Sequence, residues 1–276
     1  KCGDVMRYEL LYFIKNKRTR FCLIILVLLF IVYTILQFFD LKAYVINLAA
    51  AGMKFDFSAD MPDSVSALYF WYGICAGNSW PYGYLLNYLN MFMTLILIPL
   101  LLAMVFVDAF VQDFNARVTD AIIVREGKLR YFANKFLLSF AGPFVTIFLL
   151  LIFQFLFGLF MLKVIPTGFQ SPGIGMKEIG IVLFTSLKMG VYYGAIMTFS
   201  YALSLVLKRR KTIVYVYPVI LALFSVFLFN PPLHDMSYYY TNLVHEDIRF
   251  FWGVLITMLI VSFGVQLNAL REKSLL

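Results

Sequence analysis

The sequence contains few charged residues for its length. Only 14% of the 276 residues are Asp, Glu, Lys or Arg, whereas 62% are hydrophobic and 18% are aromatic. A soluble domain has about 25% charged residues, so this composition excludes an ordinary soluble protein. It predicts an all-α integral membrane protein that forms one domain over residues 1–276.

Residues that form disulfides or bind metals are also scarce. The three cysteines are predicted to lie on the inner side (Cys2), in the first membrane span (Cys22) and on the outer side (Cys75), so no structural disulfide is expected. The two histidines, His234 and His245, share an outer loop without a recognised ligand spacing. We therefore expect no metal site.

Motifs for nucleotide hydrolysis and for other catalysis are absent. The phosphate-binding pattern G-x-x-x-x-G-K-[ST] fails because Leu129 follows Gly127 and Lys128, and Ile122 stands where the first glycine is needed. Neither H-E-x-x-H nor G-x-S-x-G occurs. We expect that the chain itself is not an enzyme and binds no cofactor.

The hydrophobic residues are instead concentrated in long blocks. A helix needs about 20 apolar residues to cross the hydrocarbon core of a bilayer. Six blocks of about that length predict six transmembrane helices, at about residues 21–39, 86–107, 136–162, 179–207, 212–229 and 250–269. Pro99 lies near the middle of the second block and is expected to kink that helix, with a purely structural role favoured over a hinge.

The positive charges predict the orientation of these spans. Most of the 23 Lys and Arg residues precede the first block, follow the last one, or lie in the central segment and the run 208–211. Positive charge accumulates on the cytoplasmic side, so both termini are predicted to be cytoplasmic, in a bacterial cell membrane. Attraction to anionic lipid accounts for part of the net charge of +8.

Two segments outside the spans are predicted to lie along the membrane surface. Residues 5–20 combine an apolar stripe with a basic run, which predicts an amphipathic helix at the inner interface; a flexible basic leader is the alternative. The outer segment 40–85 contains an apolar stretch at 64–76 that is too short to cross. Its aromatic residues suit the headgroup level better than a ligand site.

Lys188 is the one basic residue inside an apolar block. If the fourth helix begins near Ile179, Lys188 lies well inside the bilayer and, together with Tyr192 and Tyr193, would mark a polar pathway. Alternatively, the crossing is 189–207, and 179–187 is a partial dip or a surface helix. We favour the second interpretation, which places Lys188 at the outer boundary.

The segment 108–135 is far more polar than the blocks on either side of it. Read as a helix, it gathers Phe114, Val118, Ala121 and Ile122 on one face, and its charged residues lie mostly elsewhere. An amphipathic cytoplasmic helix of this kind could receive a soluble partner and pass its movement to both adjoining spans. A solvated turn that contacts nothing fits the pattern equally well.

This arrangement resembles the permease of an ABC-2 type exporter. The family connector begins with an aromatic and an acidic residue, matched here by Phe110 and Asp113, and continues with an apolar run, matched by 122–124. Basic residues follow, and a lysine opens the third span, as in 134–136 here. The Gly-Thr pair and the proline of the family pattern are missing, and the outer segment 40–85 is longer than usual.

The resemblance implies a cytoplasmic ATPase subunit in two copies, which carries ATP and Mg, and a second permease chain as homodimer or paralogue. It implies an ATPase contact formed by Asp113, Phe114, Arg117, Val118, Asp120, Ala121, Ile122, Arg125 and Glu126. Hydrophobic or amphipathic peptides are the expected exported cargo. The rival hypotheses are a non-transporting sensor, assembly or immunity protein, and a secondary transporter.

Overall fold

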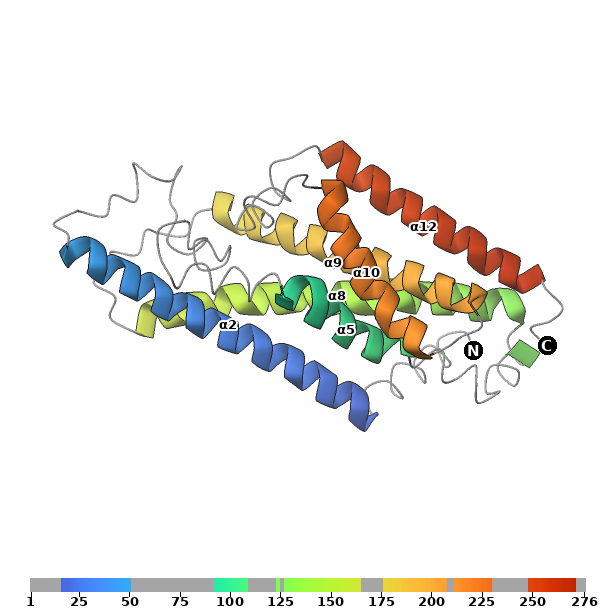
Figure 1. Ribbon diagram of the computed structural model, residues 1–276, viewed down its shortest axis with the longest axis horizontal. Coiled ribbons are helices and arrows are strands. Elements are labelled where there is room, and N and C mark those ends of the chain that lie inside the picture. The colour runs from blue at the N-terminus through green and yellow to red at the C-terminus, as the bar shows by residue number, and fades with distance from the viewer. Residues whose placement is uncertain are drawn as a thin grey trace.

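The structure, a computed structural model, describes residues 16–50, 92–108, 123–124, 127–164, 176–207, 211–229 and 248–271. These ranges are helical almost throughout (Figure 1). The helices are α2 (Lys17–Ala50), η1 (Met93–Leu97), α5 (Ile98–Leu102), η2 (Ala103–Val107), α8 (Lys128–Val164), α9 (Met176–Val206), α10 (Lys211–Phe229) and α12 (Ile248–Arg271). The expected all-helical class is confirmed for this part of the chain.

Three helical stretches are long and apolar enough to cross a membrane: Lys17–Leu36, Lys128–Met161 and Val182–Val206. Shorter apolar helices cover Leu95–Val107, Val214–Leu223 and Trp252–Asn268. Six crossings and cytoplasmic termini stay predictions. Most of the predicted interfacial helix 5–20 lies outside the described residues, and 17–20 belong to α2. Of the predicted outer segment 40–85, residues 51–85 lie outside the described residues, whereas 40–50 continue α2.

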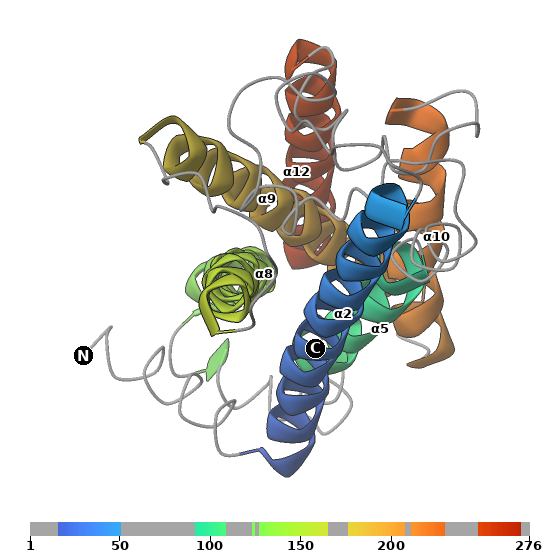
Figure 2. The same ribbon diagram turned by 90° about the vertical axis from the view of Figure 1, so that its left-hand side faces the viewer.

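The helix α9 lies at the centre of the bundle. It packs against α8, α12 and α10, and against α5 and η2 as well, and Figure 2 shows it between α8 and α12. In an 18-residue apolar window within Val182–Val206, 72% of the residues are buried, compared with 33% in the corresponding windows of α2 and α8. A helix that is apolar on every side needs such a buried position or a lipid environment.

Two glycines one turn apart bring α9 close to α8. A Cβ atom on Gly190 would lie 2.9 Å from Cδ2 and 3.0 Å from the carbonyl oxygen of Phe144. On Gly194 it would lie 2.9 Å from both of the same atoms of Phe140. This is the G-x-x-x-G arrangement, in which missing side chains let two helix backbones approach.

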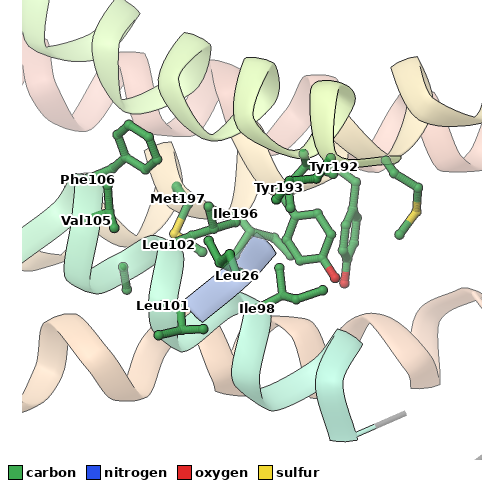
Figure 3. Packing of buried hydrophobic residues seen from close by; sticks show 14 of the residues in the cluster. Leu26, Ile98, Leu101, Leu102, Val105, Phe106, Tyr192, Tyr193, Ile196 and Met197 are labelled. Carbon is green, nitrogen blue, oxygen red and sulfur yellow. The ribbon is translucent and has the colours of Figure 1, made fainter. Parts of the chain in front are cut away.

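The second helical segment changes its hydrogen bonding around Pro99. The π-helical turns η1 and η2 flank α5, which contains this proline near its start. Proline has no N–H to donate and disturbs the preceding turn, and π turns are a common local adjustment in helices. The apolar side chains of this segment pack with Leu26 of α2 and with Tyr192, Tyr193 and Ile196 of α9 (Figure 3).

Candidate functional site

A buried carboxylate ends the second helical segment. Asp108 directly follows η2, and its side chain is 1% exposed. Its Oδ2 accepts a hydrogen bond of 2.6 Å from Nη1 of Arg18, in the first turn of α2. A carboxylate removed from water needs a cation of this kind because an isolated buried charge is strongly unfavourable.

The same arginine also reaches a third helix. Nη2 of Arg18 donates a hydrogen bond of 2.8 Å to the hydroxyl oxygen of Tyr215 on α10. The planar guanidinium presents several donors in fixed directions, so one arginine can hold two acceptors. We call Arg18, Asp108 and Tyr215 the polar node; it joins α2, the end of η2 and α10.

The start of α2 is fixed by a cap. The side chain of Asn16 accepts a hydrogen bond of 3.0 Å from the backbone N–H of Arg18, and its carbonyl oxygen accepts one of 3.1 Å from Arg20. Asparagine is a preferred N-cap because it satisfies an otherwise unpaired N–H group. The cap therefore sets the backbone position from which Arg18 extends, with 44% of its side chain exposed.

Within the polar residues 109–126, called the connector below, the described residue Ile123 contacts different helices. Ile123 is 9% exposed and forms an apolar cluster with Tyr131 and Phe132 of α8, against which Leu205 of α9 also packs. Gly127 follows with a φ of 87°. Its N–H donates to the carbonyl of Ile123 at 2.9 Å, and its own carbonyl accepts from Tyr131 at 3.2 Å. This glycine thus ends one helical turn and leads into α8.

Replacing Gly127 with alanine should lower the free energy of unfolding by about 1 kcal/mol, because L-residues are strained at positive φ. Apart from its chain neighbours, no atom of the described residues lies within 4 Å of the added Cβ, so we attribute the loss to the strained backbone conformation. Denaturant unfolding in micelles measures the effect, with Gly127→Asn as control because asparagine tolerates this conformation better. Equal losses in both variants would contradict the explanation.

The predicted pathway residues lie on one unbroken, buried helix. Lys188, Tyr192 and Tyr193 are each 1% exposed, and α9 continues through them from Met176 to Val206. The residues 179–187 are therefore helical and continuous with 189–206. The boundary position of Lys188 stays a prediction. The ammonium of Lys188 lies 5.5 Å from the ring centroid of Phe184. The buried hydroxyls of Thr185 and Ser186 have no hydrogen bond within the described ranges.

The predicted ATPase contact is not part of the described structure. Asp113, Phe114, Arg117, Val118, Asp120, Ala121, Ile122, Arg125 and Glu126 all lie outside the described residues. The structure describes Asp108, which precedes this stretch, and Ile123, which lies within it between Ile122 and Arg125. The ATPase contact and the amphipathic connector helix stay predictions.

The sequence analysis missed the polar node. It assigned Arg18 to the basic leader and Asp108 to the start of the polar segment, and gave Tyr215 no role. One signal was present: a carboxylate at the end of an apolar block requires a partner. The sequence does not say which of its many cations that partner is.

Among the described residues, no group of three or more His, Cys, Asp or Glu residues could hold a metal ion. The described contacts join Asp108 to α2, and through Arg18 to α10, and they join Ile123 to α8 and α9. No family model, curated protein or solved structure matches this chain.

Proposed function

We propose that this chain is the membrane-spanning permease subunit of an ATP-driven exporter of the ABC-2 type, with six spans and both termini in the cytoplasm. The polar node is the observation that carries the proposal. Asp108, directly before the connector, is bonded to Arg18, which also binds Tyr215. A force on the connector would therefore reach three helices through short hydrogen bonds.

A separate ATPase would supply the energy. Two copies of that subunit, carrying ATP and Mg, would dock on residues 113–126 of two permease chains, either a homodimer or a pair of paralogues. ATP binding must favour one arrangement of the spans over the other through contacts that differ between the two. The chain's own contribution is to receive this movement and to open a route for the cargo.

The buried face of α9 suits a hydrophobic or amphipathic cargo. The rings of Tyr192 and Tyr193 meet edge to face at a centroid distance of 5.1 Å and belong to the central apolar cluster. Aromatic side chains present both a large apolar surface and a polar hydroxyl. Hydrophobic or amphipathic peptides are therefore the cargo class that we propose. Lys188 would be a charged position beside the export route.

Co-purification from native membranes is the direct test. The tagged chain should bring down a soluble subunit that contains the phosphate-binding loop, and the reconstituted complex should hydrolyse ATP. An intact complex without any nucleotide-binding subunit would refute the proposal. It would favour a sensor, assembly or immunity protein instead.

Reversing the charges of Asp113, Arg117 and Asp120 should lower ATP turnover in the reconstituted complex at least tenfold, because docking depends on complementary charges at the contact. Membrane insertion should not change. The matched control is Lys163→Glu, an exposed position near the opposite end of α8, which should retain normal turnover. Equal turnover in the charge-reversed protein and the wild type would count against this contact.

Burial of Lys188 favours a second candidate, an ion-coupled secondary transporter. Ionisable groups within a membrane commonly mark ion or substrate routes, and Thr185 and Ser186 add buried hydroxyls close by on α9. The two candidates differ in their energy source. Transport by vesicles that contain this chain alone, driven by an ion gradient without ATP, would select the secondary transporter.

A further inference from the structure

One face of α9 carries a buried polar side chain in each of several successive turns. Thr185, Lys188 and Tyr192 follow one another at spacings of three and four residues, which places them along the same side of the helix. Each of them is 1% exposed. Gly190 and Gly194, which approach α8, lie on the opposite side of α9. The polar face is therefore separate from the contact with α8.

The hydroxyl of Thr185 is buried without using the hydrogen bond that the helix offers it. Elsewhere on α9, Thr198, Ser200 and Ser204 each donate to a backbone carbonyl three or four residues earlier, at 2.6–2.8 Å. The Oγ1 of Thr185 has no hydrogen bond in the described part of the chain. A buried hydroxyl without a partner costs free energy, which indicates a partner from outside the described residues.

The ammonium of Lys188 favours an anion as that partner. Residues three apart on a helix have Cβ atoms about 5–6 Å apart, so Lys188 and Thr185 can bind one group together. An ammonium has three donors and can serve a ligand in addition to its contact with Phe184, whose ring centroid lies 5.5 Å from Nζ. A metal cation would instead be repelled by the positive charge.

Phe184 also connects this polar face with the surface of the bundle. It is 44% exposed, whereas Lys188 beside it is almost fully buried. The ring that contacts the ammonium is thus itself accessible from the surroundings, which for an apolar bundle in a membrane are lipid. An amphiphile dissolved in the lipid can reach Lys188 by displacing this ring.

We propose that Thr185 and Lys188 form an anion subsite that binds the carboxylate of the exported peptide. Lys188 donates a charge-assisted hydrogen bond to one carboxylate oxygen, and the hydroxyl of Thr185 donates to the group as well. The rings of Phe184 and Tyr192 on the same helix suit apolar residues of the peptide. This inference rests on the proposed function, because it takes the cargo to be a peptide, and it adds which chemical group of the cargo is recognised.

Binding of two matched peptides tests the subsite. The probes are an N-acetylated, leucine-rich fluorescent peptide that ends in a free carboxylate and the same peptide ending in an amide. The full chain, with any subunits that co-purify, is held in nanodiscs of phosphatidylcholine, which carries no net charge. The carboxylate peptide should bind about tenfold more tightly than the amide, because hydrogen bonds between charged groups are the strong ones.

Substitutions at the two residues should remove this preference. Lys188→Met keeps an unbranched side chain without the charge and should lower the affinity for the carboxylate peptide about tenfold, to that of the amide. Thr185→Val, which changes only the hydroxyl to a methyl, should lower it about threefold. It tests the subsite even where Lys188→Met does not fold. Thr185→Ser retains a hydroxyl and should keep the affinity of the wild type.

The matched control is Ser186→Ala. Ser186 is as buried as Thr185, and its hydroxyl likewise has no hydrogen bond within the described ranges. It lies one turn before Gly190, however, on the side of α9 that approaches α8. Its replacement should leave the affinities for both peptides unchanged.

Three results would overturn the subsite. The first is equal affinity of the wild type for both peptides, or binding of neither. The second is a preference for the carboxylate that survives both Lys188→Met and Thr185→Val. The third is loss of the wild-type preference when a small fraction of phosphatidylglycerol is added to the nanodiscs, because the site would then bind a lipid phosphate instead of the cargo.

The proposed function can fail separately from the subsite. If no nucleotide-binding subunit co-purifies but the preference for the carboxylate is found and depends on Lys188, the subsite stands and the ATP-driven mechanism fails. If that subunit is present and hydrolyses ATP but the wild type shows no preference, only the subsite is refuted.

Discussion

Replacing Arg18 with alanine is expected to lower the free energy of unfolding by about 3 kcal/mol, because the substitution leaves a buried carboxylate without its cation. Asp108 is almost fully buried, whereas 44% of the Arg18 side chain is exposed. The buried carboxylate therefore needs the ion pair to stabilise its charge more than the half-exposed guanidinium does. Loss of the bond to Tyr215 adds to the effect.

Unfolding in detergent micelles, followed by circular dichroism against denaturant, measures this loss. Lys17→Ala is the matched control, since Lys17 is exposed one position earlier in α2, and its expected effect is within about 0.5 kcal/mol. The double variant Arg18→Met with Asp108→Leu should be more stable than Arg18→Ala. It removes both charged groups, so no carboxylate is buried without its cation. A double variant less stable than Arg18→Ala would show that the node contributes in some other way.

Replacing Gly190 and Gly194 together with alanine is expected to lower the free energy of unfolding by about 2 to 4 kcal/mol. Each added Cβ would lie within 3.0 Å of a phenylalanine carbonyl oxygen on α8, and overpacking of this kind typically costs about 1–3 kcal/mol per site. Backbone atoms cannot rotate away as the end of a side chain can. The two helices must therefore separate locally.

The control for this prediction lies on the same helix. A Cβ on Gly180 would meet no atom of another packed element within 4 Å in the described part of the chain. Gly180→Ala should therefore be neutral or slightly stabilising, because alanine favours the helix more than glycine does. The same denaturant titration compares the variants. If Gly190→Ala and Gly194→Ala behaved like Gly180→Ala, the close approach of α8 and α9 would be refuted.

Hydropathy was sufficient to predict the helical class of the described residues and three membrane-length helices among the six predicted. Backbone polar groups within a bilayer must be satisfied internally, so long apolar blocks become helices, and the predicted third block 136–162 lies within α8 (Lys128–Val164). The ends of the helices were predicted less accurately. Residues 128–135, assigned to the polar connector, form the first turns of α8, because a helix continues past its apolar part.

The candidate site was only partly predictable. Lys188, Tyr192 and Tyr193 are candidate pathway residues from the sequence alone, and the structure places all three in the buried part of α9. The boundary position of Lys188 stays a prediction. An apolar block does not reveal which of its faces is covered by other helices. The same limit applies to Gly190 and Gly194, whose spacing can be read but whose partners on α8 cannot.

The sequence by itself determined which segments form long apolar helices, because burial in lipid or in a protein interior selects apolar residues along a whole segment. Only the tertiary structure decided which helices meet. Arg18 finds Asp108 and Tyr215 at separations of 90 and 197 residues, and no local pattern encodes a pairing over that distance. Packing of the central helix α9 with its neighbours brings such distant positions together, and the polar node follows from that packing.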